Sequence, residues 1–160
     1  MRVRDVFQRK VDFTTPDSLL SDAARVIFGH KHRGIPVVKK DTKKLLGIIT
    51  EQDILSQLFP NIRDLVEDYV HEGDFEEMEK NVKGILGKKV RNVMSKKVFS
   101  VYLDEPLLKA ESLMKINDIS RLPVVDKKKR LIGIITKGDI FRALVNPKKK
   151  GFKWPTLIRR

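Results

Sequence analysis

The pattern of apolar and polar positions passes through the same series of changes twice along this chain. Apolar residues first follow helical spacing, over residues 19–27 and again over 107–114. Asp17 and Asp104 stand where the N-caps of these helices are expected. The pattern therefore predicts two similar amphipathic helices, one in each half of the chain.

Two short apolar runs, separated by a charged turn, follow each of these helices. They lie at 35–38 and 45–50 in the first half, and at 122–125 and 131–136 in the second. Paired runs of this kind favour a hairpin in a buried sheet. Each half should also contain a short extended stretch before its first helix and a second helix after its hairpin. The extended stretches are expected at 11–15 and 98–102, and the second helices at 52–58 and 137–145.

The residues repeat as well as the pattern. VRDVFQRKV at 3–11 matches VRNVMSKKV at 90–98, and LLGIITEQDIL at 45–55 matches LIGIITKGDIF at 131–141. A unit of about 55 residues that occurs twice indicates a duplicated supersecondary structure. We therefore predict an α+β fold of two tandem β-α-β-β-α repeats, packed as a pseudo-twofold module.

The repeats divide the chain into four parts. We place the first repeat at 1–58, a helical insert at 59–89, the second repeat at 90–145 and a basic tail at 146–160. The insert has apolar positions at helical spacing, which predicts two helices. These helices either link the repeats or dock a partner or a second copy.

The composition excludes several classes of protein. No apolar run approaches the ~18 residues of a membrane span, and the N-terminus lacks the apolar core of a signal peptide. The chain has no cysteine, which fits a reducing compartment, so a cytoplasmic location is expected. The net charge of +13 favours an anionic partner, or reflects solubility alone. Phe152 and Trp154 among the tail's basic residues leave nucleic-acid binding through residues 146–160 open.

No sequence motif of catalysis is present. The chain lacks the GxxxxGK[ST], GxGxxG, GxSxG and HExxH patterns. A zinc centre of three histidines would require every histidine of the chain. We therefore expect neither an enzyme nor a metal site nor an obligatory cofactor.

Both repeats end on a threonine followed three residues later by an aspartate. Thr50 with Asp53, and Thr136 with Asp139, are spaced as a capping box that starts the last helix of each repeat. The same carboxylate at a helix start suits the two hydroxyls of a ribose, and the helix dipole favours phosphate nearby. The spacing alone leaves both interpretations open.

These residues also resemble a known family. The VRDVF and VRNVM starts, the IPVV and LPVV runs, and the GIITEQD and GIITKGD ends are similar to those of CBS (cystathionine β-synthase) domains, over residues 3–58 and 90–145. The resemblance implies a regulatory module that binds adenine nucleotides in two clefts between its repeats. AMP, ADP or ATP is expected as the ligand, ahead of S-adenosylmethionine.

The resemblance also implies roles for individual residues. The aspartates would contact ribose with the threonines nearby, and basic residues before each hairpin would contact phosphate, unless they only solvate a helix end. Apolar residues of the first strands would contact adenine, and residues of the segment before each helix would add polar contacts. The expected ligand-binding residues are Thr50, Asp53, Thr136, Asp139, Arg33, Arg121, Ser120, His32, Ile35, Pro36, Leu122, Pro123, Phe13, Ser95 and Ser100.

A homodimer is expected as well, because helix faces in each repeat carry apolar side chains that a second copy would cover. An effector protein that the sequence does not identify would complete the regulatory system. A structural dimerisation module with empty clefts remains an alternative. The apolar faces comprise Ile54, Leu55, Leu58, Ile140, Phe141 and Leu144.

Overall fold

The computed structural model describes residues 1–58 and 72–145, and the side chains of 1–58 and 79–145. The first predicted helix of the insert and the tail at 146–160 lie outside these residues. The chain forms two compact units, and neither coincides with one half of the sequence. One unit contains Met1–Val11, Phe99–Lys127 and the residues from Ile132 onward, and we call it the N/C unit. The other contains Asp12–Val98 with Lys128–Leu131, and we call it the central unit.

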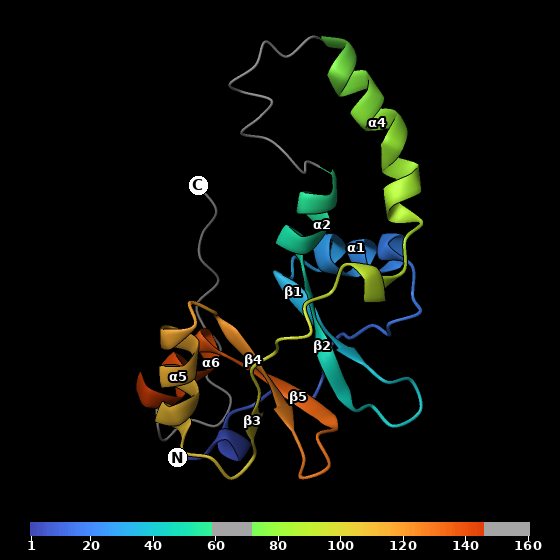
Figure 1. The fold of residues 1–160 in the computed structure, drawn as a ribbon. Helices are drawn as coiled ribbons and strands as arrows, with labels where there is room; N and C mark the ends of the chain where they lie inside the picture. Colours follow the sequence, from blue (N-terminus) through green and yellow to red (C-terminus); the bar gives the residue numbers. More distant parts are fainter. Residues whose placement is uncertain (59–71, 146–160) are drawn as a thin grey trace. The chain divides into compact units, whose positions relative to one another are not determined.

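The central unit is built on an antiparallel hairpin. Strand β1 (Gly34–Val38) pairs with β2 (Leu45–Thr50), as the apolar runs predicted. Thr14 bridges β1 in parallel, and Ser95 bridges β2 in antiparallel sense, so two further chain segments extend the hairpin on both sides. Helices α1 (Leu20–Gly29) and α2 (Glu51–Leu58) contact each other and the hairpin (Figure 1).

The N/C unit has the same plan. Strand β3 (Val101–Tyr102) pairs in parallel with β4 (Arg121–Val125), and β5 (Leu131–Thr136) follows β4 in the sheet. Gln8 bridges β5 as Ser95 bridges β2. Helices α5 (Leu107–Ile116) and α6 (Lys137–Val145) contact each other, and α5 contacts β4 (Figure 1).

Two glycines allow the bridging segments to approach the sheets. A Cβ at Gly47 would clash with the carbonyl oxygen of Ser95, and a Cβ at Gly133 would clash with that of Gln8. The backbone N–H of Ile48 donates to the Ser95 oxygen at 2.9 Å, and that of Ile134 donates to the Gln8 oxygen at 2.9 Å. Glycine at these strand positions therefore makes room for another backbone.

Each bridging segment begins with a 3₁₀ turn that belongs to the core of its unit. Val3, in the turn Val3–Asp5, is fully buried among residues of the second repeat, including Val101 and Leu107. Val90, in the turn Val90–Asn92, is fully buried among residues of the first repeat, including Leu20 and Ile49. The repeats thus exchange their N-terminal segments.

The exchange explains why the predicted N-caps are wrong. Helix α1 is preceded by Leu19 as its N-cap and α5 by Pro106, and neither residue provides a side-chain cap. Asp17 instead forms an ion pair with Arg91, and Asp104 forms the equivalent pair with Arg4. Each aspartate therefore holds the exchanged segment of its own unit.

The remaining elements refine the predicted boundaries. Helix α4 (Glu72–Leu86) contains the predicted second helix of the insert. The predicted extended stretches are reduced to β3 and to the single bridge at Thr14. Within residues 1–58 and 72–145, no helix is long and apolar enough to cross a membrane.

Candidate functional site

The end of β2 and the start of α2 form a tight corner around a carboxylate. The backbone N–H and the hydroxyl of Thr50 donate to Oδ2 of Asp53 at 2.8 and 2.7 Å. The backbone N–H of Asp53 donates back to the Thr50 Oγ1 at 3.1 Å. This is the predicted capping box, and we call it the Asp53 corner.

The N/C unit repeats this corner between β5 and α6. The backbone N–H and the hydroxyl of Thr136 donate to Oδ2 of Asp139 at 3.0 and 2.7 Å, and the Asp139 N–H donates to the Thr136 Oγ1 at 3.2 Å. We call it the Asp139 corner. The capping interpretation thus holds in both repeats, and the two corners differ only in what else contacts the carboxylate.

The carboxylate of Asp139 is saturated by its own unit. The Gln8 amide donates to both of its oxygens, at 2.9 and 3.0 Å, and the Arg142 guanidinium pairs with Oδ1. With the two bonds from Thr136, this carboxylate accepts five hydrogen bonds, and the residue is only 6% exposed. A carboxylate has about four lone-pair positions, so no acceptor capacity is left for a ligand.

Asp53 lacks these additional partners. The repeat places Ser95 at the position of Gln8, and Ser56 at the position of Arg142. Ser95 turns its hydroxyl to the Lys97 carbonyl at 3.3 Å. Among the described residues, no group donates to Oδ1 of Asp53, which is half-buried. One oxygen of this carboxylate is therefore open to a donor from a ligand.

The residues before each hairpin lie beside these corners. The N–H of Glu51 donates to the Arg33 carbonyl at 3.1 Å, and the N–H of Lys137 donates to the Ser120 carbonyl at 3.0 Å. Arg33 is exposed, and Arg121, the first residue of β4, is half-buried. The structure therefore brings Arg33 to the Asp53 corner, and Ser120 with Arg121 to the Asp139 corner.

His32 is held by a carboxylate that sequence analysis did not select. Oδ2 of Asp12 lies 2.8 Å from Nε2 of His32 and 2.7 Å from Nδ1 of His30. Hydrogen bonds from these two rings lower the pKa of the Asp12 carboxyl below its ordinary value. Because Asp12 engages Nε2 of His32, the predicted contact with phosphate would have to use Nδ1 of the ring, or Nε2 would have to leave Asp12.

The predicted adenine contacts are buried in the cores. Ile35 is 1% exposed and Leu122 is fully buried, and each belongs to the core cluster of its unit. Pro36 and Pro123 are buried as well. Phe13, by contrast, is exposed beneath the Lys43 ammonium, and Ser100 is half-buried. All the residues predicted to contact adenine are therefore buried, whereas Phe13, predicted to add a polar contact through its backbone, is open to solvent.

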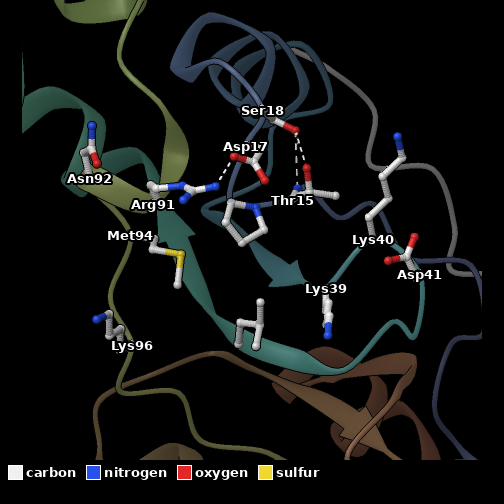
Figure 2. Close-up of a pocket in the computed structure, with 12 residues that line it drawn as sticks. Thr15, Asp17, Ser18, Lys39, Lys40, Asp41, Arg91, Asn92, Met94 and Lys96 are labelled. Carbon is white, nitrogen blue, oxygen red and sulfur yellow. Dashed lines mark hydrogen bonds and ion pairs between the residues drawn. The ribbon is translucent and has the colours of Figure 1, made fainter.

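A hollow of about 1140 Å³ in the central unit contains none of the predicted site residues. Figure 2 shows Arg91 pointing toward Asp17, with which it forms an ion pair, and the Thr15 and Ser18 hydroxyls turned toward each other. The oxygens of these two hydroxyls are 2.9 Å apart. Part of its lining comes from the exchanged segment at 90–98, whose position no local sequence pattern indicates. It is lined by Thr15, Pro16, Asp17, Ser18, Lys39, Lys40, Asp41, Leu46, Arg91, Asn92, Met94 and Lys96.

Comparison with known proteins identifies a family and several curated proteins that this chain is similar to. The family model described as CBS domain matches residues 3–59 and 90–146. Protein MJ1426 of Methanocaldococcus jannaschii is 36% identical over 156 residues, which cover 91% of this chain and 92% of that protein. Other curated relatives are longer: the chain spans 46% of protein MJ1225 of the same organism and 25% of its inosine-5'-monophosphate dehydrogenase.

Solved structures with a fold similar to that of this chain are also known. The structure of MJ1225 is matched with a TM-score of 0.72 at 30% identity, over 89% of this chain and 47% of that one. The structure of Arabidopsis thaliana CBSX2 in complex with AMP is matched with a TM-score of 0.69 at 27% identity, over 92% of this chain and 98% of that one.

Proposed function

Since this chain belongs to the CBS-domain family and contains two copies of its repeat, we propose that it is a regulatory module that senses an adenine nucleotide through the Asp53 corner. The observation that carries this proposal is the difference between the corners. Asp53 keeps one carboxylate oxygen without a donor from the described residues, whereas Asp139 accepts five hydrogen bonds.

The chemistry of the Asp53 corner suits a nucleotide. A ribose offers two adjacent hydroxyl donors, and an ionised carboxylate accepts such donors strongly. The start of α2 supplies the positive end of a helix dipole, which favours phosphate. Arg33 is exposed and bonded through its carbonyl to Glu51, so its guanidinium is available to the same phosphate.

Relatives support an adenine nucleotide as the ligand. CBSX2, which shares the repeat pair over 92% of this chain, has been crystallised with AMP. AMP, ADP and ATP share the adenosine that the Asp53 corner would hold, and they differ in the phosphates that Arg33 would meet. We propose binding in the micromolar to sub-millimolar range, roughly −5 to −8 kcal/mol.

Binding at the Asp139 corner would require a rearrangement. A ribose there would have to displace the Gln8 amide and the Arg142 guanidinium from Asp139. Hydrogen bonds to charged groups contribute about 1.5–3 kcal/mol each, so their loss would offset most of the gain from the ligand. We therefore propose one nucleotide per chain.

A reciprocal exchange of partners tests this assignment without removing either aspartate. The double variant Ser56→Arg/Ser95→Gln gives Asp53 the partners that Asp139 has, and should abolish AMP and ATP binding in calorimetry. The double variant Gln8→Ser/Arg142→Ser opens Asp139, and should leave the first site intact. Unchanged binding in the first variant would refute the Asp53 assignment.

The ligand panel tests the function itself. AMP, ADP, ATP, S-adenosylmethionine and a short oligonucleotide are compared by thermal shift, in which stabilisation follows RT ln(1 + [L]/Kd). Stabilisation by the adenine nucleotides is expected. No stabilisation by any adenine compound at millimolar concentration would contradict the sensing function. Stabilisation by the oligonucleotide alone would favour nucleic-acid binding, through a tail that lies outside the described residues.

We propose regulation rather than catalysis, exerted on an effector protein through a change between two states. Such a change requires the states to differ in nucleotide affinity. A homodimer would provide an interface for the change. Phe141, Leu144 and Val145 on α6 are 57%, 47% and 54% exposed, whereas Ile54 and Ile140, expected on this surface, are 1% exposed and belong to the cores. Light scattering at micromolar concentration should give the mass of a dimer.

A further inference from the structure

Two histidines and an aspartate of the central unit converge at the C-terminal end of α1. We propose that Asp12, His30 and His32 bind a divalent transition-metal ion, with Zn²⁺ as the ion that suits them best. This site is separate from the proposed nucleotide contact at Asp53. The sequence alone predicts no metal site, because a centre of three histidines would need every histidine of the chain. A carboxylate in place of the third histidine removes that requirement.

The three ligand atoms already face one another. Nδ1 of His30 and Nε2 of His32 lie 2.7 and 2.8 Å from Oδ2 of Asp12, and all three atoms lie within 4.8 Å of one another. The two imidazole planes are nearly perpendicular, at 86°. The two rings lie edge to face, so they do not stack on each other beside the carboxylate.

The backbone fixes these positions before an ion binds. The N–H of His30 donates to the Val26 carbonyl at 3.1 Å, and that of His32 donates to the Ile27 carbonyl at 2.8 Å. Lys31 between them adopts a left-handed conformation with φ of 55°, which reverses the chain so that both rings reach the same carboxylate. These contacts hold the two rings on one short, anchored turn.

Asp12 comes from a different segment that is anchored as well. Two residues further on, the Thr14 N–H donates to the Pro36 carbonyl at 3.0 Å, and the Thr14 carbonyl accepts from Val38 at 2.9 Å. Thr14 is itself buried. The carboxylate and the histidines therefore meet through the fold of the central unit, and the ion would join the segment before α1 to the turn after it.

The residue types suit zinc and its neighbours in the first transition series. Imidazole nitrogen and carboxylate oxygen bind Zn²⁺ at about 2.0–2.2 Å. Ligand atoms around a tetrahedral ion at this distance are about 3.3 Å apart. The two contacts between the histidine nitrogens and Oδ2 of Asp12 would therefore lengthen by roughly half an ångström when the ion binds. The side chains of His30, His32 and Asp12 are 61%, 30% and 37% exposed, which leaves them free to adjust and an ion free to enter.

Three protein ligands leave a coordination position for water. The neighbouring Lys31 and Arg33 are exposed, so solvent screens their repulsion of a cation. The same contacts would also form as hydrogen bonds in a cluster that binds no metal. Titration with Zn²⁺ distinguishes the two cases, because only a metal site would bind the ion.

The test titrates Zn²⁺ alone into the full chain without added histidine tags, with calorimetry and competition against a chromogenic chelator. One ion per chain is expected, and Asp12→Asn or His32→Ala should weaken its binding by at least about tenfold. His71→Ala removes the histidine outside the cluster and should leave the affinity unchanged. Zn²⁺ binding that survives in the double variant His30→Ala/His32→Ala would overturn the proposal. So would the absence of binding to the wild-type chain at about 100 µM Zn²⁺, a concentration that would occupy even a weak site.

A spectroscopic readout covers variants that fail to fold. Long-range ¹H–¹⁵N spectra of the wild-type chain should show Zn²⁺ shifting Nδ1 of one histidine and Nε2 of another. Shifts at the His71 ring alone would also refute the site. The experiment contains no nucleotide, so its result is independent of the proposed sensing function.

Discussion

At the scale of single residues, two identical capping boxes have acquired different surroundings. Asp53 and Asp139 make the same three contacts with their threonines, and only Asp139 binds a glutamine and an arginine in addition. Both aspartates therefore cap a helix, but only Asp53 keeps a carboxylate oxygen without a donor from the described residues.

This difference predicts unequal losses of stability without nucleotide. Asp53→Ala removes one half of a capping box and should lower the free energy of unfolding by about 1 kcal/mol. Asp139→Ala also leaves Gln8 and Arg142 without their acceptor, and should cost about 2–3 kcal/mol. Urea denaturation measures both values. Equal losses would show that the additional contacts contribute little.

The sequence indicates these roles only in part. The Thr-x-x-Asp spacing predicts both capping boxes because their partners are three residues apart. Gln8 lies 131 residues from Asp139, and no local pattern connects them. Asp12 was missed for a similar reason, since its partners His30 and His32 are 18 and 20 residues away. Contacts within one turn of chain are predictable from spacing, and contacts between segments require the fold.

At the scale of elements, each sheet contains a glycine at which the backbone of the exchanged segment lies close to the backbone of a strand. Gly47→Ala and Gly133→Ala should each lower the free energy of unfolding by about 2 kcal/mol, because the new Cβ would meet a carbonyl oxygen of the exchanged segment. Thermal or urea unfolding provides the measurement.

Gly84 is the matched control for these substitutions. It lies in α4, and a Cβ there meets no atom within 4 Å. Gly84→Ala should raise the free energy of unfolding by about 0.5–1 kcal/mol, because alanine loses less backbone entropy than glycine in a helix. Stabilisation at all three positions would contradict the close approach of the segments.

The elements themselves were largely predictable, and their ends were not. The apolar runs placed β1, β2, β4 and β5 to within one residue, because polar or charged residues bound each run. The N-caps were misassigned because Asp17 and Asp104 satisfy arginines of the exchanged segments rather than helix N–H groups. A residue type that suits a cap also suits an ion pair.

At the scale of the whole molecule, each unit is completed by the other half of the sequence. Val3→Ala should therefore loosen the N/C unit, and Val90→Ala the central unit, each by about 1.5–3 kcal/mol. Hydrogen exchange measured peptide by peptide distinguishes them. Val3→Ala should speed exchange in α5 and β4, which are far from it in sequence, while the reverse pattern would contradict the exchange of segments.

The exchanged segments also set an order for assembly during synthesis. Nearly all of the central unit, Asp12–Val98, is translated before β4 and β5. Chains fold from the N-terminal side as they emerge, at about 5–20 residues per second. Met1–Val11 must therefore wait until the second repeat has been translated, because its docking partners Leu103 and Ile134 come from that repeat. Met1–Val11 therefore precedes the central unit in synthesis but reaches its final position later, and until then Val3 and Phe7 are exposed to chaperones and proteases.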